Sequence, residues 1–225
     1  MFGDIGTYLS SPGNRDLVLQ QLLEHIYLSL LPLVLGLLVA IPLGWTATRF
    51  RWLRGLLLGG ANILYTIPSL ALFVILPAII GTGITSPVNV IVALTLYTAT
   101  LLVRPVVDAL EAVPQHVVAA AVAMGYRPLA RFFAVELPLA VPVLAAGARV
   151  ASVSNISLVS VGALVGIGGL GLLFTKGFEI DYLPPIIIGI LLTLILALIV
   201  DLLIVLLRNM LTRWQRVGAH VGGGS

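Results

Sequence analysis

The six residues from Gly166 to Gly171 fit the pattern G-x-G-x-x-G, whose glycines let backbone amides approach a pyrophosphate at a helix start. That chemistry needs a strand–helix–strand unit around the pattern. Here the pattern follows a long apolar stretch and belongs to no such unit, so we reject nucleotide binding. Gly166, Gly168, Gly169 and Gly171 instead permit a tight, partly re-entrant turn that closes the outer mouth of a membrane pathway. Close packing between helices explains the same glycines equally well.

Residue sets for catalysis or metal binding are missing from the sequence. It has no HExxH, GxSxG or P-loop pattern and no cysteine, and its histidines, His25, His116 and His220, lie far apart. The formal net charge is only +3, and the arginines lie in short clusters beside apolar runs, which does not indicate nucleic-acid binding. We therefore expect no enzymatic activity, no metal ion and no cofactor in this chain, and no nucleic-acid partner.

Two ionisable residues, Arg149 and Asp201, lie inside long apolar stretches. Burying either of them alone in a membrane is costly. The two stretches run in opposite directions, which places both residues in the cytoplasmic half of the membrane. We expect them to form an intramembrane ion pair or to share a polar network. Snorkelling of both side chains to the membrane surface is an equally good explanation.

The elements that carry these residues follow from a composition that suits a bilayer, with 60% hydrophobic and 9% charged residues among 225. A spanning helix needs about 20 mainly apolar residues, because its backbone groups find no partner in lipid. Five segments reach this length: Ile26 to Thr48, Leu56 to Ile80, Val88 to Val107, Leu139 to Leu164, and Leu183 to Leu207. The sequence therefore predicts an all-α membrane protein with about five transmembrane helices. Kinks are expected at the prolines inside these segments, which are Pro32, Pro42, Pro68, Pro77 and Pro142.

Basic residues indicate the orientation, because positively charged loops close to spans tend to remain in the cytoplasm. Only Arg15 and Lys176 fall on one side of the predicted spans. Nine basic residues fall on the other side: Arg49, Arg51, Arg54, Arg104, Arg127, Arg131, Arg208, Arg213 and Arg216. We therefore expect the N-terminus outside and the C-terminus in the cytoplasm.

Three regions follow from this topology. Residues 1–21 form an extracytoplasmic segment, and the stretch Asp16 to Glu24 is expected to start the first helix as an amphipathic surface segment. Residues 22–216 form the transmembrane domain. Residues 217–225 end in Gly-Gly-Gly-Ser and form a flexible tail.

Polar residues inside the second and fourth spans are candidates for a translocation path. Thr66, Pro68 and Ser69 lie mid-span, where the hydroxyls can bond to carbonyls that the proline leaves free. In the fourth span, four polar residues gather within six positions: Ser152, Ser154, Asn155 and Ser157. Lipid disfavours these groups, so they should face the bundle interior or a subunit interface, with Ser154 and Asn155 facing the path. The aromatic residues Tyr65, Tyr97 and Trp45 could offer cation–π contacts to a quaternary ammonium group, although packing or interfacial roles are more common.

The third connection, residues 108–138, is unusually long for a loop between two spans. Its middle, Pro114 to Pro128, contains apolar and small residues followed by Gly125, which is typical of a short helix ended by glycine. A cytoplasmic helix this apolar needs a partner surface. That partner is another protein or this chain's own bundle.

At this connection the sequence resembles the permease subunits of bacterial binding-protein-dependent ABC importers. Their signature is Glu-Ala-Ala, three residues, Gly, nine residues and Ile-x-Leu-Pro, and the matching positions here are Ala120, Ala121, Gly125, Val135, Leu137 and Pro138. Ala119 stands where the signature has glutamate, which puts one polar contact in doubt. The resemblance implies a coupling helix that docks on a separate ATPase subunit. The coupling residues would be Ala120, Ala121, Met124, Gly125, Tyr126, Arg127 and Pro128.

Further stretches resemble permeases for osmoprotectants such as glycine betaine, choline and carnitine. They are Leu23 to Ser29, Thr66 to Leu72, Val135 to Pro142 and Leu164 to Gly171. The resemblance implies a methionine-importer-like fold in the bacterial cytoplasmic membrane. It also implies alternating access with a second permease subunit, identical or homologous, two ABC ATPase subunits that hold ATP and Mg²⁺, and an extracytoplasmic solute-binding protein. The exact solute stays open, because amino-acid importers of the methionine type share this core. A secondary transporter would need ion-coupling residues and usually inverted repeats, and no convincing repeat is present.

Overall fold

The computed structural model describes residues 2–213. The predicted tail at 217–225, together with Arg216 and His220, lies outside these residues. Within them, all regular structure is helical. In chain order it consists of α1 (Phe2–Ser10), α2 (Pro12–Arg49), α3 (Arg51–Tyr65), α4 (Ser69–Ile80), α5 (Pro87–Glu111), α6 (Gln115–Ala123), α7 (Pro128–Arg131), the π-helix η1 (Phe132–Glu136), α8 (Leu137–Gly162), the 3₁₀-helix η2 (Ala163–Val165), α9 (Gly171–Glu179) and α10 (Leu183–Leu211).

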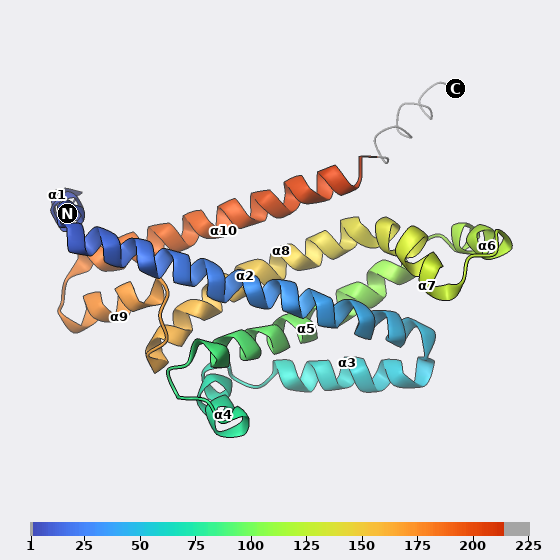
Figure 1. Cartoon of the computed structure of the whole chain (residues 1–225), viewed down its shortest axis with the longest axis horizontal. Helices are drawn as coiled ribbons and strands as arrows, with labels where there is room; N and C mark the ends of the chain where they lie inside the picture. The colour runs from blue at the N-terminus through green and yellow to red at the C-terminus, as the bar shows by residue number, and fades with distance from the viewer. Residues whose placement is uncertain (1, 214–225) are drawn as a thin grey trace.

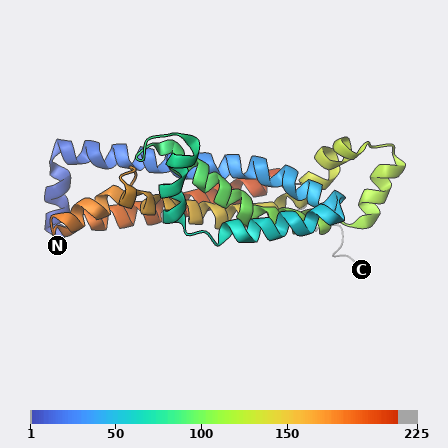
Figure 2. The same cartoon turned by 90° about the horizontal axis from the view of Figure 1, so that it is seen from below.

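The long helices lie side by side along one axis and form an elongated bundle (Figures 1 and 2). The helices α2, α5 and α10 and the stretch Pro128–Val165 are each long and apolar enough to cross a membrane. The bent pair of α3 and α4 adds a fifth crossing if it counts as one broken span. The prediction of about five transmembrane helices is therefore confirmed.

The second predicted span, Leu56 to Ile80, is not one kinked helix. The helices α3 and α4 meet at 103°, so the expected kink is a full break. Pro68 has no N–H to continue the helix and restricts the residue before it to extended conformations. The freed carbonyl of Ile67 accepts a hydrogen bond from the Tyr97 hydroxyl of α5. Thr66 Oγ1 donates to the Ile63 carbonyl oxygen at 2.6 Å, which caps α3 from its own side chain.

The first helix begins well before the predicted span. Helix α2 starts with Pro12 in its first turn, a position that tolerates the missing N–H, and continues through Pro32 and Pro42 to Arg49. Its 38 residues correspond to about 57 Å, longer than the roughly 30 Å hydrocarbon core. The stretch Asp16 to Glu24 is thus part of the spanning helix and extends beyond the membrane core.

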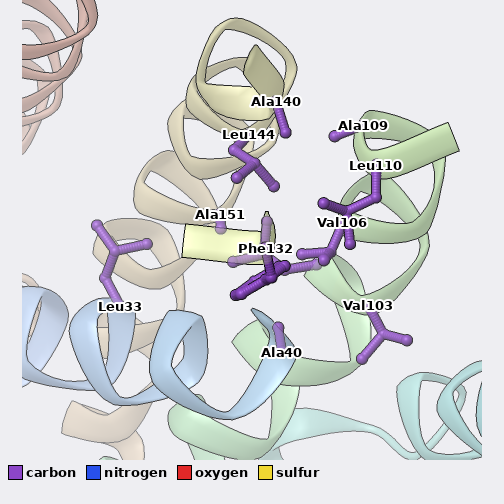
Figure 3. Close-up of a cluster of buried hydrophobic side chains, with 11 residues drawn as sticks. Leu33, Ala40, Val103, Val106, Ala109, Leu110, Phe132, Ala140, Leu144 and Ala151 are labelled. Carbon is purple, nitrogen blue, oxygen red and sulfur yellow. The ribbon is translucent and has the colours of Figure 1, made fainter. Parts of the chain in front are cut away.

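The core of the bundle lies where α2, α5 and α8 meet, and small residues let these helices approach closely. An ideal Cβ at Gly36 would lie 2.4 Å from Thr98 Cβ, and one at Gly44 would lie 2.4 Å from Val106 Cγ1. Near one end of the bundle, the Phe132 ring of η1 fills the space between the three helices (Figure 3). The third connection, residues 108–138, which we call the coupling loop after the resemblance, is therefore anchored in the core by Phe132, whereas Phe133 is largely exposed.

We predict that Gly36→Leu destabilises the chain, because its side chain would occupy the space of Thr98. Overpacking of this kind costs about 1–3 kcal/mol. Gly59→Leu in α3 is the matched control, since an ideal Cβ there has no atom within 4 Å. Thermal unfolding of the purified chain in detergent should show a lower midpoint only for Gly36→Leu. Equal midpoints for the two variants would contradict the close contact of α2 with α5.

Candidate functional site

The coupling loop presents the helix α6 at one end of the molecule, away from the N-terminus (Figure 1). Gly125 ends α6 in the left-handed conformation, with φ +83°. The Gly125 amide donates to the Val122 carbonyl at 2.9 Å and the Tyr126 amide donates to the Ala121 carbonyl at 3.1 Å. This pair of bonds is the Schellman motif, in which glycine avoids the steric penalty of positive φ. Arg127 is then extended and Pro128 starts α7.

The surface of this loop is largely apolar and uncovered. Of the seven residues that the resemblance assigns to coupling, Ala121 is buried and the other six are exposed. Met124 is 70% exposed and the neighbouring Leu129 is 60% exposed. The loop is held at its base by an ion pair between Arg131 Nε and Glu136 Oε1 at 2.5 Å. Packing on the chain's own bundle thus covers Ala121 and part of Val117 and Val118, and it leaves Val122, Met124 and Leu129 exposed.

The polar cluster of the fourth span divides into a buried and an open face of α8. Asn155 is buried, and its Nδ2 donates to Thr98 Oγ1 at 2.9 Å and to the Ser29 carbonyl at 3.3 Å. Its amide therefore joins α8 to α5 and α2, and the residue also lines a crevice with Ser154, Tyr65 and Tyr97. Ser152 is also buried, whereas Ser154 and Ser157 face outward. Sequence periodicity could not separate these roles, because it does not show which helices pack on which face.

The break between α3 and α4 borders this open face. Thr66 and Pro68 are exposed and Ser69 is partly buried. Tyr65 packs edge-on against Tyr97 with ring centroids 5.9 Å apart, and both line a narrow crevice with Ser154. The third aromatic candidate, Trp45, lies elsewhere. It packs on Phe132 with ring centroids 5.5 Å apart and has the Arg49 guanidinium 6.0 Å above its ring.

Arg149 and Asp201 lie beside each other on the same open face. Arg149 Nε donates to Asp201 Oδ1 at 2.5 Å, and Nη2 donates to Oδ2 at 2.8 Å. This bidentate arrangement is the strongest geometry available to the two side chains. The pair lines a groove of about 530 Å³ between α8 and α10, together with Ser154 and Ser157. Because Ser154 borders both the groove and the tyrosine crevice, the two hollows adjoin as one strip along α8, in which the polar side chains lie among apolar ones such as Val150 and Val153.

The glycine turn connects α8 to α9 and is packed against α2. Gly166 and Gly169 have φ values of +77° and +98°, which glycine adopts without strain. An ideal Cβ at Gly168 would lie 2.1 Å from a Glu24 oxygen, and one at Gly171 would lie 2.4 Å from the Ser160 carbonyl oxygen. The pattern therefore serves both a tight turn and close approach to neighbouring helices. In the described residues the pattern follows the helices α8 and η2 and precedes α9.

Two residues of α2, Gln21 and His25, form hydrogen bonds to this turn. The sequence alone did not indicate this structural role for either residue. The Gly169 amide donates to Gln21 Oε1 at 2.8 Å, and the Leu170 amide donates to His25 Nδ1 at 3.1 Å. His25 Nε2 lies 3.0 Å from the Ile156 carbonyl oxygen. Because Nδ1 must accept, the proton lies on Nε2, and the buried imidazole is neutral with both nitrogens satisfied. In the sequence, the one indication of this role is that two polar residues lie four positions apart and therefore on the same face of a helix.

We predict that Gln21→Leu loosens the turn, because the buried Gly169 amide loses its acceptor. An unsatisfied buried donor costs about 1–3 kcal/mol, so amide exchange over 166–171 should accelerate about tenfold. Gln20→Leu is the matched control, since its side chain is exposed and no bond joins it to the turn in the described residues. Hydrogen–deuterium exchange would distinguish the two. Unchanged exchange in Gln21→Leu would show that the Gln21 bond does not hold the turn.

The similarity to known proteins extends over most of the bundle. Residues 33–213 match the family described as binding-protein-dependent transport system inner membrane component. The chain is 36% identical over 159 residues to the osmoprotectant import permease protein OsmW of Salmonella typhimurium, covering 69% of this chain and 74% of that protein. It is 33% identical over 183 residues to the glycine betaine/carnitine/choline transport system permease protein OpuCB of Bacillus subtilis, covering 81% of this chain and 82% of that one.

A solved structure shares the same fold. A chain of the MetNI methionine ABC transporter, in an inward-facing form, superposes with a TM-score of 0.77 at 23% identity, covering 89% of this chain and 99% of that chain. The predicted methionine-importer-like fold is thus confirmed at the level of architecture. Together with the apolar spans and the family match over residues 33–213, these findings establish that the chain is a multi-pass inner-membrane protein and belongs to the family of binding-protein-dependent transport system inner membrane components.

Proposed function

We propose that this chain is the permease subunit of an ATP-driven importer for an osmoprotectant such as glycine betaine, choline or carnitine. The observation that carries the proposal is the helix α6, whose apolar surface projects from the end of the bundle and ends in the Gly125 turn. An apolar helix in this position requires a partner. The family match supports a transport system, and the names of the two curated relatives support the solute class.

The proposed orientation places α6 in the cytoplasm. The basic turn between α2 and α3 and the C-terminal end of α10 lie at the same end of the bundle as α6 (Figure 1). Arg49, Arg51 and Arg208 belong to these elements. The N-terminus lies at the opposite end. The positive-inside rule then favours an external N-terminus and a cytoplasmic C-terminus.

In the proposed mechanism, two separate ATPase subunits bind ATP and Mg²⁺, and each receives one α6 helix. Closure of the ATPases moves the two loops toward each other and turns each bundle, so that the path opens to the outside and receives solute from a binding protein. Hydrolysis restores the inward-open state. This chain contributes the inward-open and outward-open conformations and the loop that connects them mechanically to the ATPases. The core-anchored Phe132 and the Arg131–Glu136 pair give that link a rigid base.

A second permease, identical or homologous, would cover the open face of α8. Arg149, Asp201, Ser154 and Ser157 are charged or polar, and hydrocarbon disfavours such groups. A water-filled path between two permeases gives them the polar surroundings that they need. The translocation path would then follow the strip from the ion pair to the break at Thr66, Pro68 and Ser69.

An amino-acid importer of the methionine type is the second candidate for the solute. The structural likeness to the methionine transporter supports only the shared fold, because identity there is 23%. The curated relatives that carry osmoprotectant names are 33% and 36% identical. This difference favours the osmoprotectant assignment.

We predict that Gly125→Asp abolishes coupling. A side chain at φ +83° is strained by about 1–2 kcal/mol, and the charge lies on the proposed docking surface. Gly81→Asp is the matched control, because Gly81 also has positive φ, at +72°, and no atom within 4 Å of an ideal Cβ. ATPase retention in mild detergent and ATP-dependent uptake should fall at least tenfold in Gly125→Asp alone. Equal losses in both variants would mean that backbone strain, and not docking, is responsible.

We predict ATP-dependent accumulation of at least one of glycine betaine, choline and carnitine by the whole complex in vesicles. The reason is the similarity to permeases named for these solutes. The measurement is uptake of radiolabelled solutes, with methionine tested in parallel. Uptake of methionine alone would show that the chain belongs to an amino-acid importer instead. Accumulation without the ATPase subunits would overturn the importer mechanism itself.

A further inference from the structure

The Arg149–Asp201 pair lies deep within the membrane-spanning part of the bundle. At 1.5 Å per residue, Arg149 is about 18 Å from the start of α8 and Asp201 is about 15 Å from the end of α10. Ion pairs at such depth are expensive unless they face protein or water. A second copy or a close relative on this side, as proposed above, leaves the groove as the place where water and solute can reach the pair.

The side chains of the Arg149–Asp201 pair are more exposed than those of the ion pair that supports the coupling loop. The side chains of Arg149 and Asp201 are 43% and 30% exposed, whereas those of Arg131 and Glu136 are 13% and 12% exposed. A pair that serves only to fasten α8 to α10 has no need of an adjoining groove of about 530 Å³. That size lies within the roughly 300–1,000 Å³ typical of small-molecule sites.

Both side chains keep unused binding capacity toward the groove. A guanidinium has five N–H donors, and Arg149 gives one from Nε and one from Nη2 to Asp201. Among residues 2–213, no acceptor bonds Arg149 Nη1. Each Asp201 oxygen accepts one bond from Arg149 and retains a lone pair. The hydroxyls of Ser154 and Ser157 border the same space.

We propose that the Arg149–Asp201 pair is a subsite for zwitterionic solutes on the translocation path, an assignment that rests on the proposed importer function. The solute carboxylate accepts hydrogen bonds from Arg149 Nη1, while its onium group approaches Asp201. Opposite charges a few ångströms apart on the protein are complementary to a compact zwitterion placed head to tail against them. A quaternary ammonium group has no N–H, so its attraction to Asp201 is purely electrostatic.

Specificity follows from this geometry. A zwitterion such as glycine betaine uses both members of the pair, whereas a simple cation such as choline uses only Asp201. Removing the guanidinium should therefore weaken the zwitterion selectively. Removing the carboxylate should weaken both solutes.

The test measures ATP-dependent uptake of glycine betaine and choline by the whole complex in vesicles. We expect Arg149→Gln to raise the KM ratio of glycine betaine to choline at least tenfold and Asp201→Asn to raise both KM values. The control Arg104→Gln removes a cation from an exposed ion pair with Asp108 on α5 and should leave the ratio unchanged. In the charge exchange Arg149→Asp with Asp201→Arg, both charges return to the groove, and the ratio should move back toward the wild-type value.

An unchanged ratio in Arg149→Gln would show that the pair is only a structural contact and does not bind the solute. Failure of the wild-type complex to take up glycine betaine, choline and carnitine alike would instead overturn the proposed function.

A second measurement does not disturb the ion pair. The chain has no cysteine, so Ser157→Cys places a single thiol in the groove and Ser10→Cys places one far from it. In the assembled complex, glycine betaine should slow labelling of this chain at Ser157→Cys by a charged thiol reagent more than equimolar choline does. Neither solute should affect Ser10→Cys. Equal protection by the two solutes, or none, would contradict a zwitterion subsite even if the Arg149 variants fail to assemble.

Discussion

The structure depends on one constraint: lipid provides no partner for a polar group, so each polar side chain of the bundle must find one within protein or in a water-filled path. Asn155 meets this demand by bonding Thr98 of α5 and the Ser29 carbonyl of α2. His25 meets it by bonding the Leu170 amide on one side and facing the Ile156 carbonyl on the other. These contacts connect helices that the chain's connectivity does not otherwise bring together.

Helix α2 is the element on which most of these contacts converge. At one end it holds the glycine turn through Gln21 and His25. At its middle, Gly36 and Gly44 allow α5 to approach closely. At its other end, Trp45 packs on Phe132 at the base of the coupling loop. A single helix that continues past Pro32 and Pro42 thus contacts both the glycine turn and the base of the coupling loop.

The sequence was sufficient for features that depend on local order. Apolar length predicted the spans, and Gly125 followed by Pro128 predicted the end of the coupling helix. It was insufficient where partners are distant along the chain. Nothing near Gly169 indicates that its amide bonds Gln21, which is 148 positions away. Pro68 predicted a kink, but neither the 103° break nor the bond from the Tyr97 hydroxyl to the Ile67 carbonyl could be read from the sequence around it. The burial of Asn155 and its bond to Thr98 likewise depend on how α8 packs on α5.

The way α8 combines three tasks suggests how force would pass through the proposed permease. Its first end continues directly from the π-helix η1, a geometry often found at functional positions in helices. Phe132 fixes η1 in the core, so motion of α6 would turn α8 about this point instead of sliding it. The ion pair ties the middle of α8 to α10, and the glycine turn ties its far end to α2. In the proposed mechanism, rotation at the loop would act on the open face of α8 between these two contacts, where Ser154 and Ser157 lie.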